Sequence, residues 1–145
     1  MMSTTHNTLA FVDLETTGTT ATCDRITEVG IVQVDEDGVR EWHSLVNPET
    51  RISPFIESLT GINQAMVDAA PTFAQLAREI RERLEGRLFI AHNARFDHGF
   101  LKNEFARVGH TFKPAVLCTV KLSRHLYPGF ARHNLDSLIA RHHLE

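Results

Sequence analysis

Two acidic side chains, Asp13 and Glu15, lie two positions apart in the short apolar segment LAFVDLE (Leu9 to Glu15). Alternate residues of an extended strand face the same side, so both carboxylates should share one face of a predicted strand. Two converging acids at the end of a buried strand must be solvated, protonated or neutralised by a cation. Because Mg²⁺ and Mn²⁺ prefer oxygen ligands, the Asp-x-Glu pair is a candidate metal site.

A third acid, Asp97, follows a second apolar segment, RLFIAH (87–92). The carboxyl ends of the strands are where active sites of α/β sheets tend to lie, which places Asp97 in the same region as the pair at 13 and 15. The alternative is a solvated acid in the first turn of a helix, where negative charge is favourable.

The elements around these acids predict an α/β domain with a mixed sheet. The first three strands form an antiparallel meander, and two more follow; they are expected at 9–15, 26–36, 39–48, 87–92 and 115–119. A short helix should begin at Pro54, turn Phe55, Ile56 and Leu59 inward and stop at Gly61. Further helices are expected at 72–85, 96–108, 120–126 and 134–144.

Three segments resemble successive signatures of the DnaQ-like 3′→5′ exonucleases, the DEDD superfamily, in its histidine subfamily. They are FVDLETTG (11–18), LTGI (59–62) and HNARFDHGFL (92–101). The similarity extends over nearly the whole chain, from about residue 9. It implies a ribonuclease H-like fold and release of nucleoside 5′-monophosphates from single-stranded nucleic acid ends, in proofreading or repair.

The resemblance also implies roles for individual residues. Asp13, Glu15 and Asp97 match three of the four acidic ligands that hold two divalent metal ions, Mg²⁺ or Mn²⁺, for in-line displacement at phosphorus. The positions that match the substrate-binding segments are Thr16, Thr17, Gly61, Ile62, His92 and Phe96. Core packing is the alternative role for Ile62 and Phe96.

The third signature of the histidine subfamily, a His followed five residues later by the fourth Asp, is absent from these 145 residues. His133 and Asp136 are only three apart, in a segment that resembles the helix before that signature. We therefore expect the exonuclease domain (8–145) to be truncated before its last catalytic helix and to be inactive or weak alone. A domain that lacks its general base by nature is the alternative.

Charge is distributed unevenly along the chain. Residues 1–86 hold six Arg and fourteen acids, a net charge of −8, whereas residues 87–145 hold nine basic and four acidic residues, a net charge of +5. A polyanionic substrate is therefore compatible with the overall charge of −3. No long apolar run or secretory signal is present, so the expected location is cytoplasmic, with no membrane partner.

The sequence thus predicts a metal-dependent 3′→5′ exonuclease. The expected partners are a single-stranded 3′ end, DNA rather than RNA, and a DNA polymerase subunit. Two alternatives stay open at this point: a non-catalytic nucleic-acid or polymerase binding module of the same fold, and an RNA-trimming exonuclease, since the sequence does not determine contacts to a 2′-hydroxyl.

Overall fold

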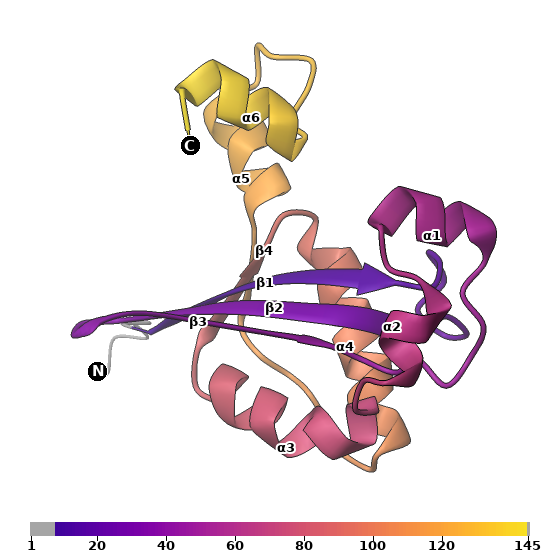
Figure 1. Ribbon diagram of the computed structural model, residues 1–145. Coiled ribbons are helices and arrows are strands. Elements are labelled where there is room, and N and C mark those ends of the chain that lie inside the picture. Colours follow the sequence, from indigo (N-terminus) through magenta and orange to yellow (C-terminus); the bar gives the residue numbers. More distant parts are fainter. Residues whose placement is uncertain (1–7, 145) are drawn as a thin grey trace.

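A five-stranded mixed sheet forms the centre of the protein in the computed structural model, which describes residues 8–144 (Figure 1). The strand order is β3-β2-β1-β4-β5. The strands are β1 (Leu9–Thr16), β2 (Ile26–Asp35), β3 (Gly38–Leu45), β4 (Leu88–Ala91) and β5 (Val116–Cys118). The meander β1-β2-β3 is antiparallel, and β4 and β5 run parallel to β1, which confirms the predicted mixed sheet.

Six helices are assigned within the described residues. They are α1 (Pro54–Thr60), α2 (Gln64–Asp68), α3 (Phe73–Leu84), α4 (Ala94–Arg107), α5 (Thr119–Leu126) and α6 (Leu135–His142). Local chemistry fixes several helix starts. Ser53 caps α1, a capping box of Thr72 and Gln75 begins α3, and Asn134 caps α6 through the N–H of Ser137. The short helix α2 was not predicted.

One face of the sheet packs against α3 and α4; in Figure 1, α3 lies below the sheet and α4 passes behind the strands. Alternate residues of β1, including Val12 and Leu14, join Phe73 of α3 and Phe100 of α4 in a single apolar core. The other residues of β1 face the opposite side, so Asp13 and Glu15 lie on the sheet face that α3 and α4 leave open. The core therefore forces both carboxylates outward.

A second, smaller cluster lies beside the end of β3. It joins Ile52, Ile62 and Val67 with the partly buried Leu45 and Ile56. The prediction that Phe55 and Leu59 face inward is wrong, because they are 73% and 70% exposed. With only seven residues, α1 contacts this small cluster along a single narrow line, which Ile56 occupies.

The last two helices form a pair that stands apart at the end of β5 (Figure 1). α6 contains no buried residue, although Leu135, Leu138 and Ile139 give it an apolar side. No helix in the described range 8–144 is long and apolar enough to cross a membrane.

Candidate active site

The three predicted carboxylates come from two elements that meet at one edge of the sheet. Past Phe11, β1 has no paired residue on β4, because the ladder between the two strands ends at Phe11 and Ile90. The end of β1 therefore has a free edge. The chain turns at Asn93, which has a left-handed backbone (φ 73°), and α4 then brings Asp97 to that edge.

The surroundings of Asp97 disfavour its charge. The side chain is only 5% exposed, and burial, followed by the negative charge of Asp13, raises its pKa to about 7. Glu15 contributes a smaller repulsion. The backbone N–H groups of Asp97 itself and of Leu14 face the carboxylate and act in the opposite direction. Asp97 thus lies against β1, next to both predicted partners.

Glu15 has a further acidic neighbour, Glu28, which no sequence motif indicates. Burial and the charges of Asp13 and Glu28 raise the pKa of Glu15. Glu28 lies directly opposite Glu15 in the antiparallel pair of β1 and β2. Only the strand register brings these two residues together, and a register cannot be read from the sequence with that precision.

The donor set fits a divalent cation. Asp13, Glu15 and Asp97 offer carboxylate oxygens, which suit a hard ion such as Mg²⁺ or Mn²⁺, and their mutual repulsion is what a bound cation would relieve. Within residues 8–144, however, no three acidic, histidine or cysteine side chains converge tightly enough to form a finished metal cluster. The three acids lie near one another but do not form a complete set of metal ligands.

Thr16 is the last residue of β1, and Thr17 begins the loop that follows it. The Thr16 hydroxyl donates to the Gly18 carbonyl (2.6 Å), and the Thr17 hydroxyl donates to Asp24 (3.3 Å) while accepting from the Arg25 N–H (3.0 Å). Both hydroxyls therefore shape the loop itself. Contact with a nucleotide stays a prediction for both residues.

Phe96 lies in the first turn of α4 and its ring is 4.7 Å, centroid to centroid, from that of Phe100. Together with Thr19, Ala21, Asn93 and Arg95, these two rings line a pocket of about 290 Å³ between the β1–β2 loop and α4. Asp97 is not among the residues that line this pocket. Phe96 stays a candidate for contact with a nucleobase, although its ring also packs against the core.

Gly61 and Ile62 lie farther along the open face. Gly61 ends α1 with a left-handed backbone (φ 75°), and Ile62 is buried in the small cluster with Leu45. Leu45, Glu28 and Glu15 form one row across three strands, which places this cluster on the same sheet face as the carboxylates. A structural role is evident for Ile62, and contact with substrate stays a prediction.

His92 has a contact set of its own. Its Nδ1 lies 2.9 Å from the Thr119 hydroxyl, and its Nε2 lies 2.8 Å from the carbonyl of His133. Both ring nitrogens therefore connect β4 to the C-terminal helices. The resemblance implies that His92 binds substrate. To do so through a ring nitrogen, His92 would have to break one of these two hydrogen bonds.

The structure gives His133 and Asp136 other roles than catalysis. His133 Nδ1 pairs with the Ser123 hydroxyl (2.8 Å) and its Nε2 with the Phe130 carbonyl (2.9 Å), so neither nitrogen is available as a base. Asp136 is exposed in the first turn of α6, where its charge favours the helix.

An apolar groove of about 690 Å³ runs along the open face, with Asp13 on its wall. Phe11, Val32 and Ile90 of the sheet line one side, and Leu135 and Leu138 of α6 line the other. Leu144, the last described residue, also lines it. Of the three acids, only Asp13 lines this groove.

The sequence of the chain matches a known protein family. The RNase_T exonuclease family matches residues 10–145. The chain belongs to this exonuclease family. The match confirms the resemblance to DEDD 3′→5′ exonucleases and covers all three acids described above.

Relatives with assigned names point the same way. The chain is 38% identical over 139 residues to the 3′-5′ exonuclease DinG of Staphylococcus haemolyticus, covering 94% of this chain and 15% of that protein. It is 39% identical over 127 residues to a PolC-type DNA polymerase III of Caldanaerobacter subterraneus, covering 87% of this chain and 9% of that protein. It thus spans a small part of these much longer relatives.

Solved structures share the fold. Exonuclease X in complex with 5′ overhanging duplex DNA superimposes with a TM-score of 0.77 at 27% identity, over 94% of this chain and 74% of the other. Product-bound exonuclease I gives a TM-score of 0.83 at 19% identity, over 97% and 39%. The ribonuclease H-like fold expected from the sequence is confirmed.

Proposed function

We propose that this domain is a metal-dependent 3′→5′ exonuclease that removes nucleoside 5′-monophosphates from single-stranded DNA ends. One observation carries the proposal: β1 and α4 bring Asp13, Glu15 and Asp97 to one edge of the sheet, where burial and mutual repulsion raise the pKa of Asp97 to about 7. Such a set of carboxylates is costly unless a cation neutralises it.

Each group has a part in the reaction. Asp13, Glu15 and Asp97 would hold Mg²⁺ or Mn²⁺, which supplies Lewis acidity to activate water and to offset charge developing at phosphorus. Thr16 and Thr17, fixed by their bonds within the β1–β2 loop, position the terminal nucleotide. Phe96 and its pocket receive the base, because an aromatic face stacks on any nucleobase.

The active site needs two more groups, a base and a fourth acid. We infer that they come from a segment that follows residue 145 and packs into the apolar groove beside Asp13. Leu144 and Asp13 line the same groove. General base catalysis contributes about 10²- to 10⁴-fold in rate, so the 145-residue chain should be slow alone.

DNA is the proposed substrate, and a DNA polymerase the proposed partner. The relatives include a PolC-type DNA polymerase III, and the exonuclease X structure contains DNA. Function in proofreading or repair and a cytoplasmic location accompany this proposal. The following test distinguishes this DNA exonuclease from an RNA-trimming enzyme and from a non-catalytic binding module.

The test uses a 5′-labelled single-stranded oligonucleotide, as DNA and as RNA, with Mn²⁺ or with EDTA. We expect the chain to shorten the DNA slowly and stepwise from its 3′ end, and a chain extended to the stop codon of its gene to do so much faster. Asp13→Ala should abolish both activities, and Asp136→Ala, a surface acid of α6, should leave them unchanged. Faster cleavage of RNA would favour the RNA-trimming enzyme. Binding without cleavage by the extended chain would favour the binding module.

A further inference from the structure

Glu104 is a buried carboxylate that the proposed reaction does not use. It lies on α4 and is only 1% exposed. Three donors surround it: Arg25 Nε (2.8 Å), Arg107 (2.9 Å) and the backbone N–H of Ile26 (3.1 Å). Burying a carboxylate and its charged partners costs desolvation free energy. We therefore asked what the contacts of Glu104 hold in place.

The place where Glu104 contacts the sheet is a β-bulge. Glu15 pairs with Glu28, whereas the next residue, Thr16, pairs with Ile26, so Thr27 is an extra residue on β2. Bulges change the direction of the residues that follow them and often lie next to active sites. Here the bulge separates Glu15, a proposed metal ligand, from Thr16 and Thr17, which begin the proposed nucleotide-binding loop.

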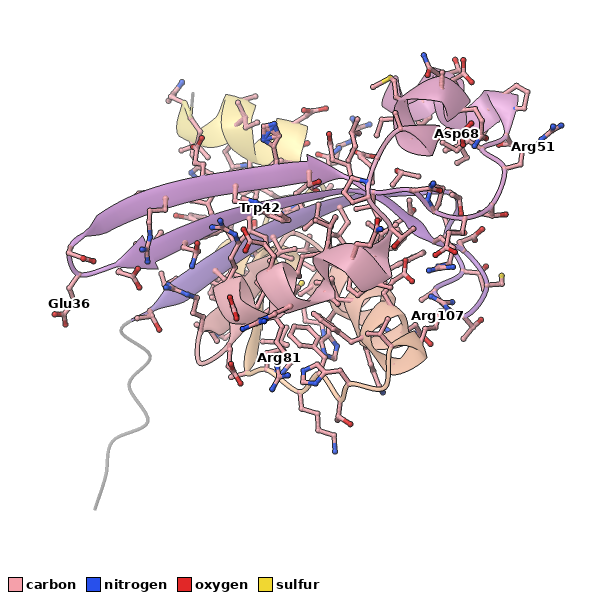
Figure 2. The ribbon with its side chains drawn as sticks, turned by 60° about the horizontal axis from the view of Figure 1, so that its bottom comes forward. Glu36, Trp42, Arg51, Asp68, Arg81 and Arg107 are labelled. Atoms are coloured by element: carbon pink, nitrogen blue, oxygen red, sulfur yellow. The ribbon has the colours of Figure 1, made fainter. Side chains whose placement is uncertain are left out.

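Arg25 joins this bulge to the loop. Its backbone carbonyl accepts from the Thr17 N–H (2.8 Å), its own N–H donates to the Thr17 hydroxyl (3.0 Å), and its side chain donates to Glu104. Arg107 adds a second link, because it also donates to the carbonyl of Thr22 in the same loop (3.2 Å). Figure 2 shows Arg107 at the end of α4 beside this loop.

Glu104 and Asp97 belong to one rigid element. They are seven residues apart on α4, which is close to two helical turns, so they lie on the same side of the helix about 10 Å apart along its axis. One helix therefore delivers Asp97 to the carboxylate edge and holds the loop that follows Glu15. The separation between the two contacts is fixed by helix geometry.

We propose that Glu104 and Arg25 are positioning residues that hold Thr16 and Thr17 in place for the 3′-terminal nucleotide, relative to Asp97. The proposal rests on the exonuclease function proposed above. Up to Glu15, regular pairing with β2 holds β1 and so keeps Asp13 and Glu15 in place. The helix α4, which carries Asp97, is held separately by Phe100, Leu101 and Phe105 in the main core. Loss of the pair should weaken nucleotide binding and spare metal binding.

The test compares Glu104→Gln and Arg25→Lys with matched controls at a partly buried ion pair. Asp35 and Arg87, 2.7 Å apart, join β2 to the segment before β4, near the opposite end of β1. Asp35→Asn and Arg87→Lys therefore make the same chemical changes far from the loop. Three properties are measured below the unfolding temperature of every variant: hydrogen exchange of residues 16–26, Mn²⁺ affinity by electron paramagnetic resonance, and affinity for a single-stranded oligonucleotide with Ca²⁺.

For Glu104→Gln and Arg25→Lys we expect faster exchange at 16–26, oligonucleotide binding about tenfold weaker and Mn²⁺ affinity unchanged. The Asp35 and Arg87 variants should match wild type in all three. Unchanged oligonucleotide affinity overturns the positioning role, as does an equal loss of Mn²⁺ and oligonucleotide binding, which would indicate a general folding role. A wild-type chain that binds neither ligand refutes the proposed function itself, and the positioning role with it, even if exchange at 16–26 responds.

Discussion

The carboxyl group of Asp97 on α4 lies close enough to that of Asp13 on β1 for their charges to repel, in a site where Asp97 is almost fully buried. Neither acid has a salt-bridge partner among the described residues. Folding thus places two acids together, and only the backbone N–H groups of Asp97 and Leu14 partly offset the repulsion at Asp97. The energetic cost of this arrangement is what makes the site responsive to protons and to cations.

Stability of the metal-free domain should depend on the protonation of Asp97. The folded-state pKa of about 7 lies above the ordinary value of 3.8, so the folded state binds this proton more tightly than the unfolded chain does. Its stabilising effect is complete below about pH 4 and is lost as the pH rises to about 7. Since each pKa unit is worth about 1.4 kcal/mol, the loss amounts to roughly 4 kcal/mol.

Urea unfolding in EDTA at several pH values measures this effect. Asp97→Asn should remove it, so the variant should be more stable than wild type at pH 8 and lose that advantage near pH 4. Asp136→Asn, an exposed acid on α6, serves as the control. Parallel pH profiles for wild type and Asp97→Asn would contradict the assigned surroundings of Asp97.

The β1–β2 loop should not tolerate a side chain at position 18. A Cβ on Gly18 would lie 2.4 Å from the carboxylate of Asp24, which must then move away from Thr17 and the Thr20 N–H. We expect Gly18→Ala to cost about 1 kcal/mol and Asp24→Ala about the same, with the double variant no worse than either. Gly129→Ala, which has open space around it, should be neutral in the same unfolding assay. Fully additive costs would mean that the two positions act independently.

The C-terminal helices should depend on His92. Its ring joins Thr119 and the His133 carbonyl, and α6 buries no residue of its own. His92→Ala should destabilise the domain by about 2 kcal/mol and raise hydrogen exchange in α5 and α6 more than in α3. Faster exchange confined to α5 and α6 would be specific to the loss of the two His92 hydrogen bonds. Equal acceleration in α3 would show that His92 supports the whole fold instead.

The exposed residues of α1 and its partly buried residue Ile56 should respond differently to substitution. Ile56 packs in the small cluster, so Ile56→Ala should cost about 1 to 2 kcal/mol, whereas Phe55→Ser should change stability by less than about 0.5 kcal/mol. Thermal unfolding of the two variants provides the comparison. A large loss for Phe55→Ser would restore the inward orientation that the sequence had suggested.

Sequence patterns predicted the sheet and the main helices well because those elements have strong local signals. Thr17 and Gly18 follow the end of β1, and Ser53, Thr72 and Asn134 are residue types that commonly cap helices, as they do here. The orientation of Phe55 and Leu59 could not be inferred, since a helical spacing of apolar residues does not reveal whether a partner surface exists.

The sequence predicts which acids form the carboxylate site, but it does not predict which residues hold those acids and the adjoining loop in place. Asp13, Glu15 and Asp97 belong to recognisable motifs, whereas Glu28, Arg25 and Glu104 reach the site through strand register and a bulge. These contacts connect residues up to 79 positions apart in the sequence. A single sequence has no periodic signal for such a pairing.

The claim that Asp13, Glu15 and Asp97 form a divalent-metal site is tested most directly by Mn²⁺ binding to the 145-residue chain, followed by electron paramagnetic resonance. We expect saturable binding by wild type, with affinity at least about tenfold weaker in Asp13→Asn and Asp97→Asn and unchanged in Asp136→Asn. Absence of binding by wild type, or equal affinity in all four proteins, would contradict it.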